Sequence, residues 1–186
     1  MKNFWIENRK YIGKTLLYQF GGAFFGIMLL TATQAIKNAE WLPQVASYIA
    51  ILFYLYLIYT LIWDKGGQDR IKYDGGRMNK NLKTGFLISL AANIPNIILA
   101  IIIIISYQFK SATVAATIHT VSKGIAILWE GMYTGLVLTY SPNNPIIFAL
   151  MIIPSLLVST AAYLMGFNNK KVFGNLFDKK KSEVSK

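Results

Sequence analysis

Three ionisable side chains interrupt an otherwise apolar segment, residues 111–143: His119, Lys123 and Glu130. If residues 112–140 form one helix at about 100° per residue, Lys123 lies about 40° and Glu130 about 20° around the axis from His119. The three therefore share one narrow stripe. Ionisable groups at membrane depth are costly and face an interior or water. The stripe predicts either the lining of a polar cavity that can carry protons, or an interfacial outer helix whose polar side faces water.

These side chains do not form a catalytic centre. Along a continuous helix, His119 and Glu130 are about 16 Å apart, too far to act as an acid–base pair on one reacting group. His119 is the sole histidine of the chain, and it lacks the companions that a metal site or a nucleophile needs. The sequence contains no cysteine, which excludes disulfides, cysteine-ligated zinc and thiol nucleophiles. We therefore expect no enzymatic activity, no metal and no cofactor.

A second polar group lies inside a long apolar run, where Asn93, Pro95 and Asn96 fall within one helical turn. Proline removes a backbone hydrogen bond and frees a carbonyl, and the two asparagines lie on adjacent faces of that turn. The pattern predicts a kink held by interhelical hydrogen bonds or, alternatively, a polar binding point near the midplane, as in transporters with broken helices. Pro154, in the last apolar run, is a second helix-breaking residue that can face the first.

The elements that must hold these residues are membrane helices. The chain has 186 residues, of which 54% are hydrophobic and 15% charged, and its mean hydropathy is +0.42. Soluble domains average about 25% charged residues. The apolar residues form runs of about 20, the length that crosses a bilayer, so the sequence argues against a soluble enzyme. We predict an all-α, polytopic membrane helix bundle with four transmembrane helices, at residues 16–36, 43–63, 86–107 and 146–167. Trp41 and Trp63 are about 33 Å apart along a helix, which places one tryptophan at each membrane interface.

The distribution of positive charge predicts the orientation. Segments 1–14, 64–84 and 168–186 carry 16 of the 19 lysines and arginines. Short loops rich in these residues stay on the cytoplasmic side. We therefore expect a protein of the cell membrane whose two termini and 64–84 loop lie on the cytoplasmic side. An odd number of crossings would expose the basic tail. Segment 111–143 therefore either crosses twice, giving six spans, or forms one re-entrant or interfacial outer helix, which we favour.

The domain organisation follows from these segments. Residues 1–14 form a basic cytoplasmic N-terminus, and no small-residue cleavage site ends the apolar run after it, so we expect the first span to be retained. Residues 15–167 form a single transmembrane domain with an outer segment at 108–143. Residues 168–186 form a basic tail in which Phe173, Leu176 and Phe177 are mixed with lysines, a composition that favours a short amphipathic turn on the inner leaflet.

The inner loop at residues 64–84 is the most distinctive polar stretch. Glycine pairs at 66–67 and 75–76 permit turns, so we expect local folding, such as a short hairpin around residues 71–73. Its basic side chains are expected to contact anionic lipid head groups or a partner protein: Lys65, Arg70, Lys72, Arg77, Lys80 and Lys83. Nucleic-acid binding is not expected, because the positive charge is distributed as membrane topology demands.

Small residues in the first span predict a close helix contact. Gly21, Gly22 and Gly26 lie in this span, and Gly22 with Gly26 forms a small-xxx-small pair. This pair predicts a packing face inside the protein, with docking onto a partner subunit as the alternative.

The sequence favours a small, non-enzymatic accessory or integral subunit of a membrane complex, with another membrane subunit or a second copy as partner. The alternative is a small-solute or ion transport protein, either a substrate-binding subunit or a channel, with a polar pathway around Asn93, Asn96, His119 and Glu130. The two hypotheses differ in what they predict for substitutions. A scaffold tolerates isosteric changes at Asn93 and Glu130, whereas a transporter loses flux in Glu130→Gln or Asn93→Ala while it still assembles.

Overall fold

The structure is a computed structural model that describes residues 2–34, 36, 39, 41–140 and 143–170. The described part contains helices, turns and loops and no strand. Its elements in chain order are α1 (Lys2–Gln34), α2 (Leu42–Asp74), α3 (Thr84–Ala92), α4 (Ile94–Gln108), α5 (Thr113–Trp129), the 3-10 helix η1 (Gly131–Tyr133), α6 (Thr134–Tyr140), α7 (Ile147–Leu150) and α8 (Ile152–Phe167). The expected amphipathic turn in the tail lies outside the described residues.

The expectation of an all-helical fold is confirmed for the described residues, and the expected membrane helices have candidates among them. Three stretches are helical, long and apolar enough to cross a membrane: Phe4–Thr33, Leu42–Asp74 and Ile147–Phe167. The pair α3 and α4 passes the same test together, although the two helices are bent by 55° where they meet. The described chain therefore holds three candidate spans, or up to four if the bent pair is one span.

The bend between α3 and α4 has a clear local cause. Pro95 occupies the first turn of α4, where its missing N–H and fixed backbone angle are tolerated. The chain stays hydrogen-bonded on both sides of the break: the N–H of Asn93 donates to Ser89 at 2.9 Å, and the N–H of Ile97 donates to the carbonyl of Asn93 at 2.9 Å. The proline predicted a kink, and the structure has one at this position.

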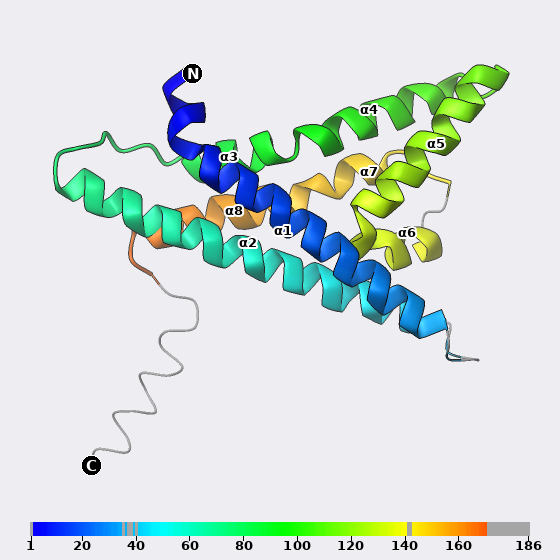
Figure 1. Cartoon of the computed structure of the whole chain (residues 1–186), viewed down its shortest axis with the longest axis horizontal. Helices are drawn as coiled ribbons and strands as arrows, with labels where there is room; N and C mark the ends of the chain where they lie inside the picture. The colour runs from blue at the N-terminus through cyan, green and yellow to red at the C-terminus, as the bar shows by residue number, and fades with distance from the viewer. Residues whose placement is uncertain (1, 35, 37–38, 40, 141–142, 171–186) are drawn as a thin grey trace, which may run out of the picture.

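Helix α2 is the centre of the bundle. It packs against α8 along one side and against α1 along another, and α3 closes the group by packing against both α8 and α1. The contact with α8 is close because of glycine: a Cβ added to Gly66 would lie 2.8 Å from the backbone nitrogen of Phe167. Figure 1 shows α1, α2, α3 and α8 side by side, and α4 with α5 as a hairpin that diverges from them.

The chain returns from that hairpin to the middle of the bundle. Helix α5 packs on α4, and its C-terminal end leads into η1, which contacts α1 and α2. Helix α6 then packs on α2, and α7 and α8 follow. Segment 112–140 is therefore not one continuous helix, because it breaks at Glu130 (Figure 1).

One end of the bundle carries most of the described positive charge, and we call residues 2–14, 64–84 and 166–170 the basic end (Figure 1). Here the expectation of a loop from residue 64 is wrong, since α2 continues as a helix to Asp74. The hairpin around residues 71–73 is likewise absent from the described chain. Pairs four residues apart favour the helix: Lys65 with Asp69 and Arg70 with Asp74.

Candidate functional site

The two predicted asparagines form a buried polar chain at the bend between α3 and α4. The side-chain N–H groups of Asn93 donate to the Ser89 carbonyl at 2.8 Å and to Ser155 Oγ of α8 at 3.0 Å. Asn96 Nδ2 donates to Asn93 Oδ1 at 2.9 Å, and Trp129 Nε1 of α5 donates to Asn96 Oδ1 at 2.7 Å. These bonds join three separate segments, so the asparagines hold the helices together as the kink interpretation expects.

Glu130 directly follows Trp129, the last residue of α5, and has almost no solvent access. The residue is 4% exposed, and its Oε2 has no hydrogen-bond partner among the described residues. The hydroxyl of Tyr133 and both side-chain amide atoms of Gln19 are also buried without a partner in that part of the chain. Orphaned buried polar atoms are uncommon and call for an explanation.

The surroundings of Glu130 come from several helices. Tyr54 of α2 and Tyr133 of η1 lie within electrostatic range of its carboxyl group. The following residue, Gly131, touches the carbonyl of Ala23 and the side chain of Ile27 in α1. Gln19 is on the same face of α1 as Ala23, one turn earlier. On an ideal helix Tyr133 flanks the stripe of His119, Lys123 and Glu130 at about 40°, whereas Gln19 and Tyr54 carry no periodic or motif signal.

His119 lies elsewhere, between α4 and α5. Its Nδ1 is 3.2 Å from the carbonyl of Ile103 and 3.4 Å from Ser106 Oγ, and its ring is 5.6 Å from that of Tyr107. Because a carbonyl only accepts, Nδ1 carries the proton when it bonds to Ile103. His119 thus joins the two helices of the diverging hairpin.

Lys123 belongs with His119 rather than with Glu130. Both side chains line an open hollow of about 470 Å³ on the α4–α5 hairpin, and Glu130 is not part of that lining. The three ionisable residues therefore do not form a single site, because Glu130 follows the end of α5 and is buried in the bundle.

The glycine face of α1 is occupied inside this protein. A Cβ at Gly22 would lie 3.1 Å from Tyr54 Cβ and 3.2 Å from Met132 Sδ, and one at Gly26 would overlap the backbone of Met132. Gly21 points away, with nothing within 4 Å of an added Cβ. The small-xxx-small pair packs against η1, as the intramolecular interpretation expects.

At the basic end, Lys65 and Asp69 form a buried ion pair. Lys65 Nζ lies 2.7 Å from Asp69 Oδ1, and Tyr163 of α8 donates to Asp69 Oδ2 at 3.0 Å. Lys65 is 5% exposed and lies over the ring of Tyr11 at 5.3 Å. The structure therefore places Lys65 in the packed interior and not among the basic residues that can face lipid.

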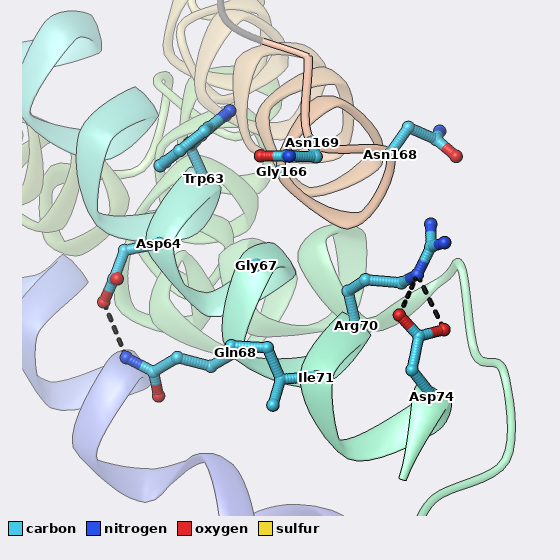
Figure 2. Close-up of a pocket in the computed structure, with 10 residues that line it drawn as sticks. All are labelled: Trp63, Asp64, Gly67, Gln68, Arg70, Ile71, Asp74, Gly166, Asn168 and Asn169. Carbon is cyan, nitrogen blue, oxygen red and sulfur yellow. Dashed lines mark hydrogen bonds and ion pairs between the residues drawn. The ribbon is translucent and has the colours of Figure 1, made fainter. Parts of the chain in front are cut away.

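Two hollows open on opposite sides of α2 at this end. Figure 2 shows the first, about 500 Å³, between the last turns of α2 and the end of α8. Its lining consists of Trp63, Asp64, Gly67, Gln68, Arg70, Ile71, Asp74, Gly166, Asn168 and Asn169. The second, about 360 Å³, lies between α1, α2 and the start of α3, and Lys72 and Arg77 supply its exposed cations.

Arg70 organises the first hollow. Its Nε donates to both carboxylate oxygens of Asp74, at 2.8 and 2.7 Å, and its Nη1 donates to the carbonyl of Phe167 at 3.2 Å. On the far wall Gln68 Nε2 donates to Asp64 at 2.8 Å (Figure 2). The remaining predicted basic residues, Lys80 and Lys83, are exposed in the segment that leads into α3.

Metal binding is not indicated in the described part of the chain, where no group of three or more histidine, cysteine or acidic side chains converges. Comparisons with protein family models, with curated proteins and with solved structures find no match for this chain.

Proposed function

We propose that this chain is a non-enzymatic integral subunit of a membrane assembly, and that its partner docks on the basic end. In this proposal the protein lies in the cell membrane with both termini in the cytoplasm, as the distribution of lysine and arginine favours. The observation that carries the proposal is the extension of α2, which stays helical for eleven residues after Trp63, the residue at which the sequence predicts the membrane interface.

Buried polar contacts hold this extension, residues 64–74, to the rest of the bundle, and we call it the platform. Eleven helical residues rise about 16 Å, and the buried pair of Lys65 and Asp69 fastens the base of the extension to Tyr163 of α8. A loop that only sets topology needs no such bracing. A rigid helix outside the bilayer instead offers a fixed surface for another protein.

Apolar side chains are exposed on this platform. Ile71 is 66% exposed at the rim of the first hollow, and Tyr73 is 42% exposed on the same helix. Outside the bilayer such exposure is a cost, which a docked partner removes by covering the side chains. The exposed cations Arg77, Lys80 and Lys83 add contacts to anionic lipid head groups.

The outer segment fits a re-entrant arrangement in the same proposal. Helix α5 leads toward the centre, η1 turns there, and α6 leads away. Irregular backbone at membrane depth is tolerated where protein covers it, and η1 is covered by α1 and α2. This geometry supports a segment that enters and leaves on the outer side, which gives an even number of crossings.

The test is capture of the partner from the native membrane. A photo-crosslinking residue in place of Ile71 should join the chain to one stoichiometric protein, and Ile71→Asp should abolish co-purification of that protein in mild detergent. Leu82→Asp is the matched control, since Leu82 is an exposed apolar residue of the same end outside both hollows. Purification of the chain alone, without a crosslinked protein, would contradict the proposal.

Transport of an ion or small solute is a second candidate, and the orphaned polar atoms around Glu130 favour it. Proton movement can be followed with a pH-sensitive dye inside liposomes that contain the purified chain. Flux that Glu130→Gln abolishes, with assembly unchanged, would place transport ahead of the subunit role.

A further inference from the structure

Glu130 is the one acidic side chain among the described residues that lies in the middle of the bundle. The other described acids, Glu7, Asp64, Asp69 and Asp74, all belong to the basic end. Glu130 is 4% exposed and its Oε2 is unpartnered within the described chain. No described cation forms an ion pair with it.

An ionised carboxylate in this position is strongly disfavoured. Removing a charge from water costs several kcal/mol even after relaxation, and a bilayer around the bundle offers no water to compensate. The carboxyl group therefore needs neutralisation by something that binds to it.

The groups that face Glu130 do not supply a compensating charge. Tyr54 of α2 and Tyr133 of η1 lie near its carboxyl group, but phenols are neutral near pH 7. The facing surface of α1, with Gln19, Gly22, Ala23 and Gly26, contains no ionisable residue. On α5 itself, Lys123 lies about 10 Å away along the axis.

The neighbouring elements add no acid either. The tyrosine of α6, Tyr140, is exposed and bonds Gln44 at 3.1 Å. The buried serines of α8, Ser155 and Ser159, are hydroxyls and carry no charge. A divalent cation prefers several carboxylate and carbonyl oxygens around it, whereas a proton needs one.

We propose that Glu130 is an intramembrane proton-binding site. One proton taken from water forms an O–H bond with a carboxylate oxygen, and no bond of the protein breaks. The neutral acid then offers one donor and one acceptor to its surroundings, where the hydroxyl of Tyr133 has unused hydrogen-bonding capacity. The inference goes beyond the subunit role and holds whether or not the chain transports a solute.

Infrared spectroscopy of the purified chain in lipid nanodiscs tests the proposal directly. A protonated carboxyl group absorbs at a higher frequency than a carboxylate, and exposed acids are ionised at pH 7. We expect a protonated-carboxyl band at pH 7 that is present in the native chain, present in Glu7→Gln, and absent in Glu130→Gln. A native spectrum without this band, or a band that survives Glu130→Gln, would overturn the proposal.

Unfolding measured against pH gives an independent readout. If the folded chain holds a proton that the unfolded chain has released, the folding equilibrium constant falls as pH rises, by up to about tenfold per pH unit for one proton. The neutral variant Glu130→Gln should show a flatter dependence than Glu7→Gln. A native chain that sodium stabilises relative to choline, and that lacks the carboxyl band, would bind a metal cation instead and would also overturn the proposal.

Discussion

The hydroxyl of Tyr163 donates to Asp69 at 3.0 Å and thereby connects α8 to α2 at the base of the extended helix. Asp69 is fully buried and also accepts from Lys65 at 2.7 Å. One carboxylate therefore serves both a neighbour one turn away on its own helix and a partner 94 residues later in the chain. This arrangement fixes the direction in which α2 leaves the bundle.

Removing the charge of Asp69 should destabilise the protein strongly. In Asp69→Asn the buried ammonium of Lys65 keeps its charge but loses its counter-ion, and breaking a buried pair in this way costs about 3–5 kcal/mol. The measurement is the free energy of unfolding in detergent or nanodiscs. Asp74→Asn is the matched control, because the Arg70–Asp74 pair is exposed and such pairs contribute at most about 1 kcal/mol. Equal losses in the two variants would show that Lys65 is solvated.

Two glycines of α1 should respond in opposite ways to alanine. At Gly26 the added Cβ would lie 2.6 Å from the backbone nitrogen of Met132, so Gly26→Ala must displace η1 at a cost of about 1–3 kcal/mol. At Gly21 nothing lies within 4 Å, and Gly21→Ala should be neutral or stabilising by up to about 1 kcal/mol, since alanine favours helix. The measurement is the thermal unfolding temperature of both variants. An unfolding temperature that Gly26→Ala leaves unchanged would mean that η1 does not pack on α1.

The hydrogen bond between Trp129 and Asn96 should be visible in the indole signal. Asn96→Ala removes the acceptor that lies 2.7 Å from Trp129 Nε1, which leaves a buried donor unpaired at a cost of about 1–3 kcal/mol. In a chain labelled with 15N-tryptophan, the indole resonance of Trp129 should shift and exchange faster with solvent deuterium. The resonance of Trp63, whose Nε1 donates to the carbonyl of Lys170, should stay in place. An unchanged Trp129 signal in Asn96→Ala would contradict the hydrogen bond between Trp129 Nε1 and Asn96 Oδ1.

Single cysteines can report the topology, because the chain contains no native cysteine. With an impermeant maleimide we expect Asn144→Cys to react in intact cells and Asn79→Cys to react only after permeabilisation. Met132→Cys, at a position 1% exposed, should react in neither case. Reaction of Met132→Cys from the cytoplasmic side would mean that segment 111–143 crosses twice, and an unreactive Asn144→Cys in intact cells would indicate a single crossing.

Properties that depend on composition could be predicted from the sequence. Runs of about 20 apolar residues suffice to predict membrane helices, and Pro95 between Asn93 and Asn96 suffices to predict a kink with polar bonds. Apolar runs and proline kinks are local features, so the residues next to one another in the sequence are enough to predict them. The orientation inferred from lysine and arginine is of the same kind and stays a prediction until it is measured.

The grouping of the polar residues depended on tertiary contacts. His119, Lys123 and Glu130 share a stripe in an ideal helix, but α5 ends at Trp129 because Gly131 and Gly26 let η1 press against α1, which separates Glu130 from the other two. Likewise, Lys65 and Asp69 look like parts of a solvated loop, yet Tyr163 of α8 buries them inside the bundle. Amino-acid composition alone sets which segments are apolar enough to enter the membrane. Which polar residues meet was decided by contacts between segments far apart in the chain, whose energies no local pattern contains.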